Sequence, residues 1–121
     1  MTNESASPVY FENSAPILRV EDMEASLKFY VDRLGFKNAD WSGDDFACVT
    51  RDSAAIYLCL RDQGRGEAWI WVGVEDVRRL QGEYEAKGVA ILMEPTNYPW
   101  ALEMHVEDPD GNVIRFGSEP L

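Results

Sequence analysis

Apolar residues recur at two different spacings along this chain. Over 23–34 and 77–87 they follow helical spacing, and in the first segment Leu27, Tyr30, Val31 and Leu34 form one apolar stripe. Elsewhere, short apolar or alternating runs bounded by Gly, Asp and Ser are typical of strands. The predicted strands are 15–20, 37–41, 46–50, 55–60, 69–74, 89–93, 101–106 and 113–117, with 94–99 as a loop.

The two predicted helices belong to an internal repeat. The segment Val20-Glu21-Asp22 recurs 54 residues later as Val74-Glu75-Asp76, and each Asp is a suitable helix N-cap. Gly35 and Gly88 follow the two helices, where a glycine ends a helix at least cost. The sequence therefore predicts an α+β fold of two βαβββ modules in tandem, forming a curved mixed sheet around a cavity with the helices on the outer face. Residues 1–12 are predicted to be an N-terminal arm and 13–121 one domain, with modules at 13–62 and 67–121.

The two faces of the predicted strands differ in chemistry. One face is uniformly aliphatic, and burial worth about 25 cal/mol per Å² favours packing it under the helices. The opposite face carries rings and charges, which is the usual composition of a small-molecule site. The candidate ligand-binding residues on it are Arg19, Tyr57, Trp69, Trp71, Glu103, His105 and Arg115. Trp41, Tyr98 and Trp100 are further candidates for the walls or the rim of the ligand site.

Structural roles compete with ligand binding for several of these side chains. Trp69 and Trp71 also suit a dimer interface, where aromatic residues are enriched. Glu103 and Arg115 could form a pair across adjacent strands, and a single histidine such as His105 is often structural. No catalytic triad can be assembled from this sequence, so no catalytic residue is predicted.

Composition excludes some classes of partner. The 22 acidic and 11 basic residues give a formal net charge of -11, which argues against nucleic acid as a partner. This charge is compatible with a cationic ligand, or with solubility alone. No apolar run is long enough to span a membrane, and the first residues do not read as a signal region, so a cytoplasmic location is expected. Cys48 and Cys59 are predicted to be buried free thiols.

The turn Asp108-Pro109-Asp110-Gly111-Asn112 followed by Val113-Ile114-Arg115-Phe116, together with the repeat, carries a family resemblance. From 16 to 116 the chain resembles the glyoxalase / bleomycin-resistance / extradiol-dioxygenase superfamily, also called the vicinal oxygen chelate fold. Members that use a metal have four ligand positions, which correspond here to Ala15, Tyr57, Trp69 and Arg115. Because none of these four is a normal ligand of a divalent ion, no metal and no cofactor are expected.

The resemblance is strongest to the bleomycin-resistance branch, whose members bind their ligand without metal or catalysis. It implies a homodimer, often with an exchanged N-terminal segment, that holds a cationic, planar antibiotic in an interface groove. The resulting prediction is a metal-independent protein that sequesters a cationic or aromatic small molecule, such as a bleomycin-like antibiotic, in an acidic, aromatic-lined groove. One alternative is a lyase or isomerase that uses a displaced metal, or Glu103, His105 or Tyr57 for proton transfer. Another is a sensor or partner-binding dimer.

Overall fold

The computed structural model describes residues 8–121 and contains two modules with the same order of elements. The first comprises β1 (Ile17–Arg19), α1 (Met23–Leu27), the π-helical segment η2 (Lys28–Arg33), β2 (Lys37–Asn38), β3 (Phe46–Arg51) and β4 (Ala54–Cys59). A short 3-10 turn, η3 (Arg61–Gln63), leads towards the second module. That module comprises β5 (Trp69–Gly73), α2 (Val77–Ala86), β6 (Ile91–Asn97), β7 (Leu102–Glu107) and β8 (Val113–Ser118).

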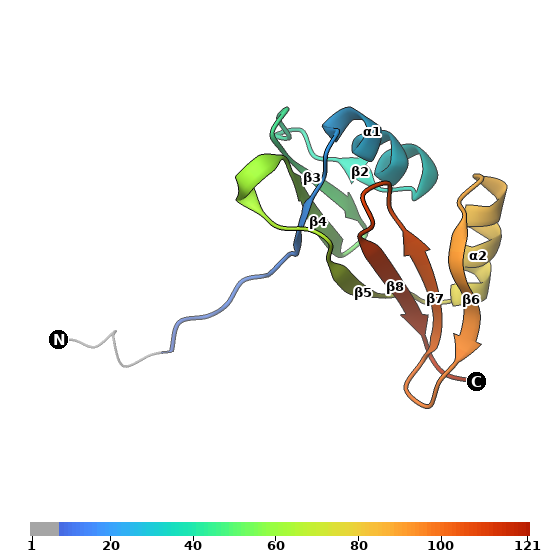
Figure 1. The fold of residues 1–121 in the computed structure, drawn as a ribbon. Helices are drawn as coiled ribbons and strands as arrows, with labels where there is room; N and C mark the ends of the chain where they lie inside the picture. Colours follow the sequence, from blue (N-terminus) through green and yellow to red (C-terminus); the bar gives the residue numbers. More distant parts are fainter. Residues whose placement is uncertain (1–7) are drawn as a thin grey trace.

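Each module forms its own four-stranded mixed sheet. The strand orders are β1-β4-β3-β2 and β5-β8-β7-β6. In both sheets the first strand pairs in parallel with the last, so that Ile17 lies opposite Tyr57 and Trp71 opposite Arg115. Figure 1 shows the two sheets with α1 and α2 beside them. The predicted α+β class and the tandem βαβββ repeat are confirmed, with one separate sheet in each module.

The ends of the helices confirm the repeat in detail. The carboxylates of Asp22 and Asp76 accept hydrogen bonds from backbone N–H groups of the first helical turns, as N-caps do. Gly35 and Gly88 both adopt positive φ, at +83° and +75°. Only glycine takes up this conformation without a steric penalty, so the chain leaves both helices in the same way.

Most boundaries lie within one or two residues of the predicted ones, and three elements differ in a way that has a physical reason. The first helix is not uniform: after α1 it widens into η2, where the Leu34 amide donates to the Phe29 carbonyl five residues earlier. Strand β2 stops at Asn38, which leaves Trp41 in a turn. Strand β6 continues through the predicted loop, because Pro95 is tolerated in an edge strand where the register with β7 shifts.

The aliphatic faces of both sheets meet the helices in one shared core, as predicted. The 108–112 turn also ties the second module to the first. Asp108 Oδ2 accepts from the Tyr30 hydroxyl at 2.9 Å, and Asp110 Oδ1 accepts from the Glu21 amide at 3.0 Å. The Asn112 side chain donates to the carbonyl of Arg19 at 3.2 Å. The turn is therefore architectural, as the sequence indicated, and it holds the modules together.

The chain before β1 leads away from the body of the molecule (Figure 1). Residues 8–14 form no helix or strand, and Val9, Tyr10 and Phe11 are 83–88% exposed. The rest of the predicted arm, residues 1–7, lies outside the described part of the chain. In residues 8–121 the helices are too short and too polar for any of them to cross a bilayer.

Candidate functional site

The outer face of the second sheet, opposite the core, gathers seven of the ten predicted residues. Strand β5 contributes two indoles, the segment between β6 and β7 contributes a phenol and an indole, and β7 and β8 contribute the polar groups. These residues are Trp69, Trp71, Tyr98, Trp100, Glu103, His105 and Arg115, and we call them the aromatic face.

Glu103 lies at the centre of the aromatic face and has no solvent-exposed surface. Arg115 binds its carboxylate with both Nε and Nη2, at 2.7–3.0 Å. The indole N–H groups of Trp71 and Trp100 donate to Oε2 at 3.1 and 2.9 Å. His105 Nε2 lies 3.3 Å from Oε1. One buried carboxylate therefore connects four side chains, which come from β5, the segment between β6 and β7, β7 and β8.

The same contacts decide the protonation state of Glu103. Burial opposes the charge, but hydrogen bonds from Arg115, Trp100, His105 and Trp71 outweigh it and lower the pKa of Glu103 to about 2. A carboxylate this acidic, with both oxygens already bonded, is a poor proton acceptor. The geometry therefore disfavours the alternative in which Glu103 and His105 carry out acid–base catalysis.

Trp71 lies flat across the sheet because two neighbouring positions are glycine. A Cβ atom on Gly117 would stand 2.5 Å from the Trp71 ring, and one on Gly73 would stand 3.0 Å from it. This space lets the indole extend from β5 over β8 to reach Glu103 on β7. Strand alternation places both glycines on the predicted ligand face, but neither is among the ten predicted site residues.

Trp100 has a different support. Its ring stacks on Tyr98 at a centroid distance of 4.8 Å and an interplanar angle of 6°. Trp69, Trp71 and Trp100 are still 55–61% exposed. Within one chain the aromatic face is thus a preformed but open surface.

The remaining predicted residues lie in the first module. Trp41 and Tyr57 pack with Phe46 in a second aromatic cluster, with centroid distances of 5.2–6.4 Å. Phe46 was missed, although strand alternation places it on the same face as Tyr57 through the β3–β4 pairing. Arg19 has a different partner, because its Nε donates to the Arg61 carbonyl at 3.0 Å.

The two cysteines have the predicted character. Cys48 and Cys59 are free and buried, and burial raises the pKa of both thiols. A buried thiol with a raised pKa holds little thiolate at neutral pH, so neither sulfur is an activated nucleophile.

The four positions that correspond to metal ligands do not form a donor set. Ala15 has no side-chain donor atom, Trp69 has only an indole N–H, and the Arg115 guanidinium is a cation bonded to Glu103, which leaves the Tyr57 hydroxyl as a single oxygen. In the described residues 8–121, no three His, Cys, Asp or Glu side chains lie close enough together to hold an ion. The residues present therefore do not suit the divalent metal that the fold family implies.

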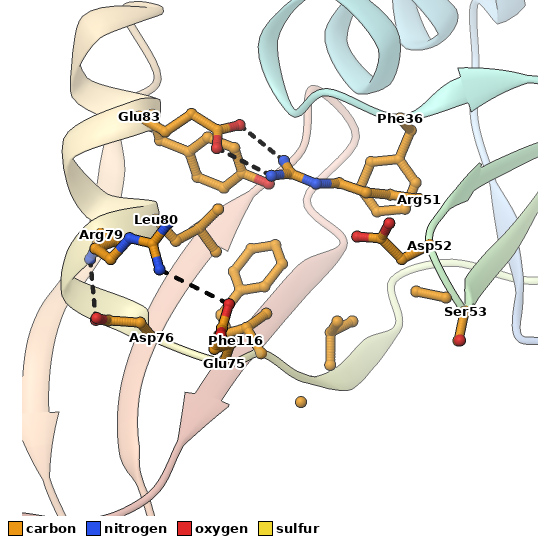
Figure 2. A pocket seen from close by; sticks show the side chains of 15 residues that line it. Phe36, Arg51, Asp52, Ser53, Glu75, Asp76, Arg79, Leu80, Glu83 and Phe116 are labelled. Atoms are coloured by element: carbon orange, nitrogen blue, oxygen red, sulfur yellow. Dashed lines mark hydrogen bonds and ion pairs between the residues drawn. The ribbon is translucent and has the colours of Figure 1, made fainter.

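A separate cavity of about 380 Å³ lies between the modules, beside α2 (Figure 2). Figure 2 shows Arg51 of β3 and Glu83 of α2 pointing toward one another at its wall, and their closest atoms are 2.7 Å apart. Its charged lining also includes Arg79 paired with Glu75 at 3.7 Å. None of the ten predicted residues, all within the described chain, lines this cavity.

Comparisons with known proteins agree with this architecture. The model of the Glyoxalase/Bleomycin resistance protein/Dioxygenase superfamily matches residues 11–116. A curated relative from Synechocystis sp., named probable lactoylglutathione lyase, is 29% identical over 116 residues, covering 82% of this chain and 88% of the relative.

Two solved structures share both the fold and part of the sequence. The bleomycin-binding protein of bleomycin-producing Streptomyces verticillus, complexed with copper(II)-bleomycin, superimposes with a TM-score of 0.73 at 27% identity, covering 92% of this chain and 98% of that one. The antibiotic-binding protein TnmS3 from Streptomyces sp. superimposes with a TM-score of 0.76 at 28% identity, covering 94% and 100%.

Proposed function

The chain belongs to the Glyoxalase/Bleomycin resistance protein/Dioxygenase superfamily, and from this premise we propose that it binds a small aromatic molecule without a metal ion and without converting it. The observation that carries this proposal is the aromatic face. Its three indoles are more than half exposed, yet two of them, Trp71 and Trp100, are fixed by a carboxylate that is fully buried. Exposed rings held in one orientation favour stacking of a flat ligand.

A second copy of the chain would complete the site. The aromatic face is open in one chain, and in the cluster of Trp41, Phe46 and Tyr57 on the other module the Trp41 ring is 60% exposed. We propose a homodimer in which these two surfaces, one from each copy, form opposite walls of a groove. The exposed apolar side chains of 9–11 suit an arm that packs on the partner copy.

The proposed ligand is planar and cationic, in the manner of bleomycin. The net charge of -11 attracts cations over a long range, and indole faces bind cations and flat rings. The bleomycin-binding protein of Streptomyces verticillus, which has the same fold, supports this class of ligand.

Calorimetric titration with bleomycin, with and without EDTA, tests both parts of the proposal. Saturable binding that EDTA leaves unchanged is expected, and Trp71→Ala should weaken it at least tenfold, or about 1.4 kcal/mol. Sedimentation analysis should give twice the 13.7 kDa mass of one chain. Absence of saturable binding to bleomycin and to other planar cations would refute the proposed ligand class, and binding that requires a metal would refute metal independence.

A lyase of the glyoxalase type is the second candidate, because one curated relative bears the name probable lactoylglutathione lyase. The unsuitable residues at the four ligand positions count against it. Turnover of the glutathione–methylglyoxal hemithioacetal after addition of Zn²⁺ or Ni²⁺, together with one bound metal per site, would replace the binding proposal with this one.

A further inference from the structure

We propose that Glu103 is the positioning residue of the ligand site: one of its oxygens holds two indoles in place and leaves their faces and outer edges for the ligand. This inference rests on the proposed binding function and adds how binding is organised. Trp71 and Trp100 come from different segments, yet both donate to the same atom, Glu103 Oε2, at 3.1 and 2.9 Å. Strand β8 separates β5 from β7 in the sheet, so these two rings do not come from paired neighbouring strands, and the carboxylate is the contact that they share.

The two hydrogen bonds set the chemistry that a ligand meets. An indole has a single N–H donor, and here both donors point inward to a carboxylate with no exposed surface. The ligand therefore receives no hydrogen bond from Trp71 or Trp100 and contacts their faces and outer edges. This arrangement selects flat ring area over polar groups on the ligand.

Arg115 makes this arrangement stable. A buried carboxylate without a partner is strongly destabilising, and the bidentate contact of Arg115 at 2.7–3.0 Å compensates the charge. The guanidinium lies on β8, between the strands that carry Trp71 and Glu103. It thus supports the carboxylate and leaves Oε2 able to accept from the indoles.

Preorganisation gives the expected size of the effect. Ordering a mobile side chain on binding has a cost in free energy, and Glu103 has already ordered two large ones. Loss of both hydrogen bonds should therefore weaken the binding of a flat ligand about tenfold. Glu103→Gln tests this because the shape is kept. Arg115 donates to Oε1 with both Nε and Nη2, so the remaining amide oxygen is expected there, which puts the amide nitrogen in the place of Oε2, where it cannot accept from the indoles.

Two further variants separate positioning from general damage. Glu107→Gln is the matched control, since Glu107 is an exposed carboxylate on the same strand and its loss changes the formal charge equally. Gly117→Ala leaves Glu103 and Arg115 in place, but its methyl group would stand 2.5 Å from the Trp71 ring. This variant should displace Trp71 alone.

The four indole N–H signals in a ¹H–¹⁵N NMR spectrum provide a direct readout. In the wild-type protein, Trp71 and Trp100 should exchange with solvent more slowly than Trp41 and Trp69. Glu103→Gln should shift and accelerate both of the slow signals, Gly117→Ala only that of Trp71, and Glu107→Gln neither. Four equally fast signals in the wild type would overturn the proposal even if Glu103→Gln does not fold.

Affinity for the planar cation proflavine, measured by fluorescence titration, completes the test. Glu103→Gln and Gly117→Ala should each bind it more weakly, the first about tenfold, with Glu107→Gln like the wild type. An unchanged affinity in Glu103→Gln, despite moved indole signals, would refute the positioning role. If the wild-type protein binds neither proflavine nor bleomycin, the proposed ligand class fails, and the NMR measurement still decides whether Glu103 holds the rings.

Discussion

Tyr30 and Tyr84 are equivalent positions of the internal repeat, and they offer a matched pair of substitutions. Both side chains are fully buried, and each hydroxyl donates one hydrogen bond of 2.9 Å across the molecule. Tyr30 donates to the carboxylate of Asp108, whereas Tyr84 donates to the backbone carbonyl of Leu34. Tyr30→Phe and Tyr84→Phe thus remove the same hydroxyl from a charged and a neutral acceptor.

The expected costs follow from the nature of each acceptor. Neither acceptor is left without a donor, since the Asn112 amide still binds Asp108 Oδ2 and Arg51 still binds the Leu34 carbonyl. The change in unfolding free energy is then the value of one hydrogen bond. We expect about 2 kcal/mol for Tyr30→Phe and about 1 kcal/mol for Tyr84→Phe, because hydrogen bonds to charged groups are stronger.

Equilibrium unfolding in urea at pH 7, followed by circular dichroism, measures both values. The dependence of unfolding free energy on urea should be the same in all three proteins, so that a shift in midpoint reports stability alone. A cost for Tyr84→Phe equal to or above that for Tyr30→Phe would refute the reasoning, because the charge of Asp108 would then contribute nothing.

Three further predictions concern the same interface between the modules. Burial raises the pKa of Tyr30 and Tyr84 far above the unfolded value of about 10, so the unfolding free energy should hold below pH 10 and fall as the pH rises further. Urea midpoints at pH 8 and 10.5 measure this fall, which should be smaller in Tyr30→Phe than in the wild-type protein. Arg51→Met removes a partly exposed bidentate contact with Glu83 and a hydrogen bond to the Leu34 carbonyl, and should cost about 2 kcal/mol in urea unfolding, since each contributes about 1 kcal/mol; a cost that does not fall in 1 M salt would contradict an ionic contribution. Asn112→Ala leaves backbone partners of a fully buried amide unpaired and should cost about 3 kcal/mol by thermal unfolding; a loss below 1 kcal/mol would show that the turn does not hold the modules together.

The elements and their faces could be predicted because they depend on local spacing. Alternation placed Leu18 in the core and Arg19 outside it, and the observed burial agrees. The predicted boundaries were wrong where contacts between distant parts of the chain changed the local structure. The π-helical turn in η2 accompanies the contact of Tyr30 with Asp108, 78 residues away, and Pro95 lies in β6 because an edge strand tolerates it.

The site could be predicted only in part. Strand alternation predicted that Trp71, Glu103, His105 and Arg115 share one face. For Glu103 it indicated only a pair with Arg115 across adjacent strands. The wider network depends on side chains that reach beyond their neighbours. The Trp71 ring crosses β8 only because Gly117 has no side chain, and that follows from the register between the strands.

By itself, the sequence determined that two similar modules fold around an aliphatic core and that rings and charges share the other face of each sheet. The periods of helix and strand fix these features, because each period can be read from a short stretch of the sequence. Only the tertiary structure decided that the strands form two sheets, that the aromatic face is open in a single chain, and that Glu103 holds two indoles. These features depend on distances between residues far apart in the chain, which no local period encodes.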